Sequence, residues 1–216
     1  PRAHRFAKEF GCQWLHVYDF ASHHEKSEQA FPEFAELRAS MEQETVQFLF
    51  HLFCDNESVL DVLDCDYTYL NPLLAKHYGI TGPEGDTWQK VRGVTTQGRG
   101  GVLTQASILS KQSGASRTSP ILRGNWLTEV LLGDKLPRPP KNVPTLPEGV
   151  PAGLTERQLI ERHSSDPACA RCHEKVDPLG FAMEQYDAIG KLRTHDAQGF
   201  AIDTKTKLQD GHAIDN

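Results

Sequence analysis

The stretch Asp166-Pro-Ala-Cys-Ala-Arg-Cys-His173, followed closely by Asp177-Pro-Leu-Gly-Phe181, decides how the last third of the chain is organised. An aspartate before a proline is typical of a helix start, so residues 168 to about 174 are expected to be helical. By the same rule Pro178 is expected to begin a further helix that runs through Tyr186. Two cysteines three positions apart on the first helix would lie on the same face.

The residues Cys169, Cys172 and His173 form a Cys-x-x-Cys-His motif. This spacing is the signature of c-type haem attachment, in which two thiols bond to one porphyrin and the adjacent histidine ligates the iron. The motif predicts one covalent haem c, with thioether bonds from both cysteines and axial ligation by His173. Two alternatives stay open: a zinc site, which needs further ligands at short range, and a redox thiol pair, which needs a preceding strand.

Residues that follow the motif are candidates for the haem surroundings. The carbonyl of Pro178 could accept the second imidazole N–H of His173 and so fix the ring. Leu179, Phe181 and Tyr186 could form walls against the porphyrin or simply pack the helices together. Residues 151–190 are too few to enclose a porphyrin alone, so further walls are expected from elsewhere in the protein.

Three residues are candidates for the sixth iron ligand. Met183 follows the motif by ten residues, and at that helical spacing a methionine often belongs to the core. His77 lies at the end of an expected helix, and His163 precedes the motif. A ligand from another part of the protein, or an open iron site, is equally consistent with the sequence.

The whole sequence predicts a mainly α fold with minor β structure near the C-terminus. A helical region over 1–95 and a Gly/Pro-rich connecting region over 96–150, with one or two helices, precede a small cytochrome-c-like haem module over 151–216. A soft boundary is placed in the Pro-rich stretch 136–147, which favours extended polyproline geometry. Helices are expected over 1–20, 32–53, 59–63, 73–78, 103–110, 120–133 and 156–163, with N-caps at Ser58, Asn71, Ser119 and Thr155 and a short hairpin between Ile202 and Leu208.

Composition narrows the range of functions. The chain has 216 residues, a formal net charge of -6 and no run of lysine or arginine, so nucleic acid is not an expected partner. No stretch is apolar for long enough to span a membrane.

The remaining cysteines, Cys12, Cys54 and Cys65, are expected to be buried thiols. A disulfide between Cys54 and Cys65 remains an alternative in an oxidising compartment. The sequence begins within a helical pattern and without methionine, which suggests a fragment of a longer protein.

The stretches Arg99–Leu109, Arg117–Trp126 and Asp166–His173, with several others, together resemble the large secreted cytochrome-c-like proteins that are abundant in planctomycetes. The resemblance covers most of the chain, and its motifs are specific. It implies one haem c module inside a longer exported polypeptide, located in the periplasm or at the cell surface, without implying a reaction. It also weakens Met183 as a ligand and slightly favours His77. The stretches are Gln13–Leu15, Phe31–Phe34, Asp66–Asn71, His77–Ile80, Arg99–Leu109, Arg117–Trp126, Asp166–His173, Asp177–Phe181 and Glu184–Gly190.

Three functions remain in view. The first is single-electron transfer through a six-coordinate haem, with a redox partner protein or a small-molecule donor or acceptor and with other domains of the same polypeptide. The second is a haem enzyme, peroxidase-like or oxidase-like, with an open or displaceable distal site. The third is a module without haem whose cysteine pair binds zinc or acts through its thiols.

Overall fold

The computed structural model describes residues 2–137, 146, 147 and 149–214. The chain divides into two compact units: Pro1–Lys111 with Ala188–Leu192, and Gln112–Asp187 with Arg193–Asn216. Helices dominate the described residues, with two short antiparallel sheets, which confirms the mainly α fold with minor β structure. The predicted segments 1–95, 96–150 and 151–216 do not coincide with the two units. Most of the Pro-rich stretch, residues 138–145, lies outside the described residues.

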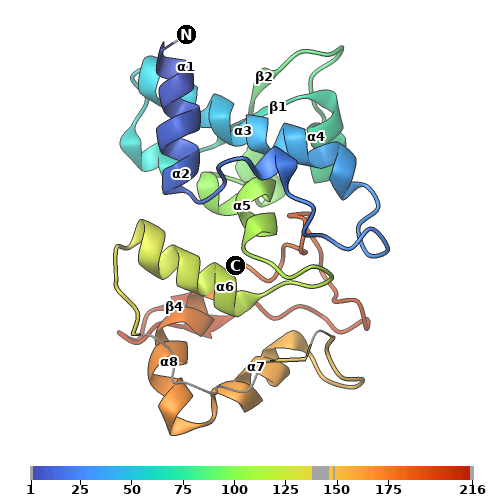
Figure 1. Cartoon of the computed structure of the whole chain (residues 1–216), viewed down its shortest axis with the longest axis vertical. Coiled ribbons are helices and arrows are strands. Elements are labelled where there is room, and N and C mark those ends of the chain that lie inside the picture. Colours follow the sequence, from blue (N-terminus) through green and yellow to red (C-terminus); the bar gives the residue numbers. More distant parts are fainter. Residues whose placement is uncertain (1, 138–145, 148, 215–216) are drawn as a thin grey trace. The chain divides into compact units, whose positions relative to one another are not determined.

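The first unit is built around one long helix, α3 (Phe34–Cys54). Its side chains Met41, Phe48 and Leu49 are fully buried and form the centre of the core. The N-terminal helical run has a π-helical turn in its middle and packs against α3 (Figure 1). The other helical segments of the unit are α1 (Arg2–Phe6), η1 (Ala7–Gly11), α2 (Cys12–Trp14), η2 (Phe20–Ser22), η3 (Val59–Val62), α4 (Pro72–Tyr78), η4 (Val94–Gln97), η5 (Val102–Thr104) and α5 (Ala106–Lys111).

A small sheet in the first unit was not expected from the sequence. Strand β1 (Tyr67–Leu70) pairs antiparallel with β2 (Gln89–Arg92), from Tyr67 opposite Arg92 to Leu70 opposite Gln89. All four residues of β1 are buried, whereas β2 is polar and partly exposed. The ammonium of Lys90 lies 3.8 Å from the ring centroid of Tyr67, an arrangement that favours a cation–π contact across the two strands.

A buried polar cluster joins the elements of the first unit. Glu44 on α3 accepts hydrogen bonds from the hydroxyls of Thr68 at 2.6 Å and Tyr78 at 2.5 Å. The guanidinium of Arg99 lies 3.5 Å from the ring centroid of Tyr78 and donates to the carbonyl of Gly190 at 2.6 Å. The cluster therefore ties residues 188–192 to α3 and α4, although those residues follow the Cys-x-x-Cys-His motif in sequence.

The second unit contains α6 (Pro120–Trp126), η6 (Leu127–Leu131), α7 (Glu156–Ser164), α8 (Pro167–Phe181) and the hairpin of β3 (Thr206–Lys207) with β4 (Ala213–Ile214). Helices α6 and α8 approach so closely that only glycine fits at two positions. A Cβ added at Gly124 would lie 1.9 Å from the carbonyl oxygen of Val176. A Cβ added at Gly180 would lie 1.9 Å from the carbonyl oxygen of Pro120. The α6 and α8 backbones are therefore in direct contact, which places α6 in the same unit as the motif helix.

Local hydrogen bonds confirm most of the predicted helix starts. Asn71 caps α4 and accepts from the backbone N–H of Leu74 at 2.9 Å. Thr155 and Gln158 form the predicted capping box at the start of α7. The boundary predicted at Pro178 is wrong, because α8 continues through Pro178 and ends at Phe181, short of the expected Tyr186. Pro178 has no backbone N–H and so cannot donate the usual helical hydrogen bond to Glu174. The hairpin expected between Ile202 and Leu208 is formed instead by Thr206–Lys207 and Ala213–Ile214.

The turn that follows α8 is held by Arg123 of α6. Its guanidinium donates to the carbonyl oxygens of Met183 and Tyr186, both at 2.8 Å, and of Asp187 at 2.6 Å. It also donates to the Ser113 hydroxyl at 3.0 Å. Burial lowers the pKa of Arg123 to about 10, so the group is still charged at neutral pH. This one side chain supplies the donors that the carbonyls of the turn need.

Candidate functional site

The Cys-x-x-Cys-His motif lies on the first two turns of α8. The carbonyl of Asp166 accepts the backbone N–H groups of Cys169 and Ala170, both at 2.9 Å, and so starts the helix. Cys169 and Cys172 are half-buried and form no disulfide. Because they are separated by three helical positions, the two thiols lie on neighbouring turns of the same face, as attachment to one porphyrin requires.

The imidazole of His173 is held by a carboxylate on its own helix. Its Nδ1 lies 2.9 Å and 3.0 Å from the two carboxylate oxygens of Asp177, one turn later. Both side chains are largely buried, with exposed fractions of 13% and 9%. An ionised carboxylate only accepts hydrogen bonds, so Nδ1 carries the proton and Nε2 keeps its lone pair for a metal ion.

The other residues predicted around the haem have separate positions. The carbonyl of Pro178, expected to accept from His173, accepts instead from the backbone N–H of Ala182 at 3.2 Å. Leu179 is half-buried and Phe181 is buried. The guanidinium of Arg157 from α7 lies 4.3 Å from the ring centroid of Phe181. Phe181 therefore packs between α8 and α7.

The three candidates for the sixth ligand differ in their surroundings. The ring of His163, on α7, lies 5.4 Å from the ring of His173, centroid to centroid. Met183 is buried in the turn held by Arg123. His77 is buried in the first unit, with Nε2 at 3.0 Å from the carbonyl oxygen of Ile189. Of the three, the structure brings His163 next to His173.

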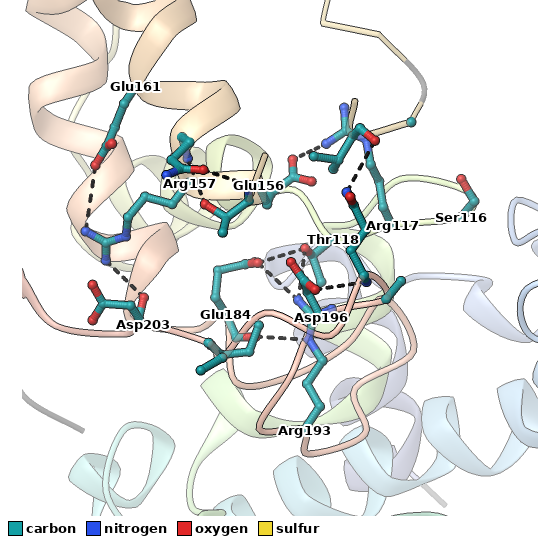
Figure 2. Close-up of a pocket in the computed structure, with 18 residues that line it drawn as sticks. Ser116, Arg117, Thr118, Glu156, Arg157, Glu161, Glu184, Arg193, Asp196 and Asp203 are labelled. Carbon is teal, nitrogen blue, oxygen red and sulfur yellow. Dashed lines mark hydrogen bonds and ion pairs between the residues drawn. The ribbon is translucent and has the colours of Figure 1, made fainter. Parts of the chain in front are cut away.

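A pocket of about 530 Å³ lies in the second unit (Figure 2). Arg117 pairs with Glu156, and Arg193 pairs with Glu184 at 3.1 Å. Thr118 donates to the same Glu184 carboxylate at 2.9 Å. Burial raises the pKa of Glu156 to about 7, and Arg117 opposes that rise. The charges facing the pocket are thus largely paired with one another.

The pocket does not follow from any short motif, because its lining comes from segments far apart in the chain. Arg117 and Glu184 lie in two of the stretches that carry the family resemblance, which is the only signal that pointed to them. Of the described residues that line the pocket, none belongs to the Cys-x-x-Cys-His motif. The pocket is therefore distinct in its lining from the motif, although both belong to the second unit.

The three cysteines outside the motif are all free thiols. Cys12 and Cys65 are buried as expected, whereas Cys54 is exposed at the end of α3. Cys65 donates to the carbonyl of Tyr67 and accepts from the N–H of Gly101, both at 3.2 Å, so the bridge considered for Cys54 and Cys65 is not formed. Burial raises the pKa of Cys12 to about 12, which keeps this thiol protonated and unreactive.

Within the described ranges, no group of three or more histidine, cysteine, aspartate or glutamate side chains is arranged to hold a metal ion. None of the helices in the described part of the chain is both long and apolar enough to cross a membrane.

Taken together, the fold and the motif define a mainly helical chain with a Cys-x-x-Cys-His helix in its second unit. Residues 99–196 match the family PSCyt3, described as a protein of unknown function (DUF1588). Residues 1–80 match the family PSD4, also described as a protein of unknown function (DUF1592). Both are domains typical of planctomycete cytochrome-c-like proteins. No curated protein and no solved structure matches the chain.

Proposed function

We propose that this chain binds one haem c covalently and transfers single electrons. In this proposal Cys169 and Cys172 supply the thioether bonds and His173 is an axial ligand of the iron. When bound, the haem supplies a one-electron couple between ferric and ferrous iron. The observation that carries the proposal is that the two thiols and the Asp177-oriented imidazole share the start of one helix.

The residues of the chain have definite tasks in this function. Asp177 accepts the Nδ1 proton of His173, which keeps the tautomer whose Nε2 faces a metal. The same carboxylate increases the electron donation of the imidazole and lowers the reduction potential. Phe181 and Val176 are buried on α8 and exclude water from the helix side of the site. Haem c is attached outside the cytoplasm, so the proposal includes a periplasmic or cell-surface location.

Haem attachment is tested by producing the chain with an export signal in a bacterium that matures c-type cytochromes. The protein should gain the mass of one haem and give a c-type pyridine haemochrome spectrum. Cys169→Ser and Cys172→Ser should each remove one thioether bond and change that spectrum. Cys54→Ser is the matched control, since it removes an exposed thiol outside the motif. Absence of haem, in cells that mature another cytochrome, would reject the proposal and favour the zinc or thiol alternative.

The pairing of His173 with Asp177 also favours a second candidate, a peroxidase-like haem enzyme. Electron donation from the proximal ligand promotes cleavage of an O–O bond, and a carboxylate partner strengthens that donation. An enzyme of this kind needs an open or displaceable position on the iron. Binding of carbon monoxide to the unaltered ferrous protein would favour the enzyme, and a spectrum that ignores the gas would favour electron transfer.

A further inference from the structure

His163 lies in the last turn of α7, and only two residues separate that helix from the start of α8. Its ring and the ring of His173 have centroids 5.4 Å apart and planes inclined at 73°. His163 is half-buried, and the side chain of His173 is largely buried. The tight connection between the helices therefore brings a second imidazole to the one that belongs to the motif.

We infer that His163 is the second axial ligand of the haem iron, an inference that rests on the haem function proposed above. Metal bonds to imidazole nitrogen are about 2 Å long, and each ring nitrogen lies about 1.2 Å from its centroid, so two imidazoles that held one metal between them would have centroids about 6.4 Å apart. The observed separation of 5.4 Å is about 1 Å shorter than that value, so the two rings would have to move apart to hold an iron between them.

The surroundings of the other two candidates support this assignment. Nε2 of His77 is engaged by the carbonyl of Ile189 within the first unit. Met183 lies in the turn whose carbonyls bind Arg123, and Met183 itself contributes one of them. Its backbone is therefore fixed by a buried contact that a shift toward the iron would disturb. His163, in the last turn of α7, lies next to the motif histidine.

A pair of imidazole ligands has a clear chemical consequence. Methionine ligation raises the potential of a c-type haem, so two imidazoles place it lower. If His163 and His173 both held the iron firmly, they would leave no position at which carbon monoxide could bind. The site would thus be suited to electron transfer at low potential and unsuited to peroxide chemistry.

The first test uses the unaltered holoprotein. Near-infrared magnetic circular dichroism of the ferric form distinguishes two imidazole ligands from an imidazole and a methionine sulfur. The signature of two imidazoles is expected, and the methionine signature would overturn the inference. A c-type protein that binds carbon monoxide without any mutation would overturn it as well. A protein without haem would instead reject the proposed function, so the two failures are distinguishable.

The second test identifies the histidine. His163→Ala should keep the thioether-bound haem but leave one coordination position of the iron open. The ferrous form of this variant should therefore bind carbon monoxide. Added imidazole should restore the spectrum of the unaltered protein. His195→Ala, which removes an exposed histidine of the same unit, should not bind the gas. If His163→Ala keeps the spectrum of the unaltered protein, another residue is the ligand.

If His163→Ala takes up no haem, His163→Met replaces it, because this variant offers a sulfur ligand at the same position. Its ferric spectrum should show the methionine signature. An unchanged signature would reject the assignment.

Discussion

Asp177 lies one turn after His173 on the same helix, and its carboxylate oxygen is 2.9 Å from Nδ1 of that histidine. Asp177 immediately precedes Pro178, a position at which helical backbone is usually disfavoured. Its helical conformation is nevertheless what carries the carboxylate back to the histidine. The hydrogen bond fixes which ring nitrogen of His173 is free for a metal. The negative charge of the Asp177 carboxylate lies in a largely buried environment.

Asp177→Asn should raise the midpoint potential of the holoprotein. The amide oxygen can still accept from Nδ1, so the tautomer is kept while the negative charge that stabilises ferric iron is lost. If the substitution lowers the ratio of ferric to ferrous haem about tenfold at a given potential, the midpoint potential rises by about 60 mV. Spectroelectrochemical titration measures the shift. Glu174→Gln removes an exposed charge from the same helix and is the control. Equal potentials for the two variants would contradict the role given to Asp177.

Gly180→Ala should destabilise the second unit. The new methyl group would lie 1.9 Å from the carbonyl oxygen of Pro120, so α6 and α8 would have to separate. Forced overpacking of this kind lowers the free energy of unfolding by about 3 kcal/mol. Hydrogen–deuterium exchange of peptides from α6 and α8 measures the loss locally. Gly149→Ala is the matched control, because its added Cβ would meet nothing within 4 Å. Slow exchange in Gly180→Ala, as in the control, would show that the helices adapt without loss.

Arg123→Met should lower the stability of the second unit by about 3 kcal/mol or more, because a buried group that pairs with several carbonyls is removed. The carbonyls of Met183, Tyr186 and Asp187 would lose their donor. Arg123→Lys should recover only part of the loss, since one ammonium cannot span the same acceptors. Urea unfolding followed by circular dichroism provides the measurement. Arg162→Ala, at an exposed site on α7, should have little effect. Full rescue by lysine would show that charge alone is needed.

Glu44 should make the first unit less stable as pH rises. Burial raises the pKa of Glu44 to about 7 from 4.5, against the opposing effect of hydrogen bonds from Thr68 and Tyr78. The folded state therefore binds its proton more tightly than the unfolded state. Below pH 4.5 the group is protonated in both states and has no effect on the pH dependence. As pH rises from 4.5 to about 7, the folded protein progressively loses about 3 kcal/mol of stability through this group, and the loss is complete above pH 7.

The difference in free energy of unfolding between the unaltered protein and Glu44→Gln isolates this effect. It should shift in favour of the glutamine variant between pH 5 and pH 8. The titration of Glu156, which has a similar pKa, is common to both proteins and cancels. Glu36→Gln, an exposed change on the same helix, should give a difference that is independent of pH. A pH-independent difference for Glu44→Gln as well would show that the carboxyl titrates normally in the fold.

Features that depend on neighbouring residues were predictable from the sequence. The capping box of Thr155 and Gln158 and the cap at Asn71 are local hydrogen bonds, and both are present as expected. The helix start predicted at Pro178 is wrong. Proline favours the first turn of a helix, but here contact with α6 keeps α8 continuous through Pro178. The sheet of β1 and β2 was missed because the exposed strand Gln89–Arg92 has no alternating apolar pattern.

The candidate site shows the same division between local and distant contacts. Cys169, Cys172 and His173 were found from spacing alone. The role of Asp177 does not follow from the motif, although a position four residues after His173 on one helix indicates that the two side chains can meet. The closeness of His163 depends on how α7 packs against α8, which no short motif encodes. The pocket beside Glu156 requires the tertiary structure, since Arg117 and Arg193 are far apart in sequence.

The glycine contact between α6 and α8 has a consequence for a chain cut in two. Helix α6 precedes the Pro-rich stretch and α8 follows it, and their backbones are in contact. The second unit is therefore held together by this contact and not by the link between Pro137 and Leu146. A protease nick in that stretch should leave two fragments associated, much as in a split protein that is reassembled from its halves. The fragment with the cysteine motif would then separate from its complement only on denaturation, and residues 151–216 alone would lack the surface on which α8 rests.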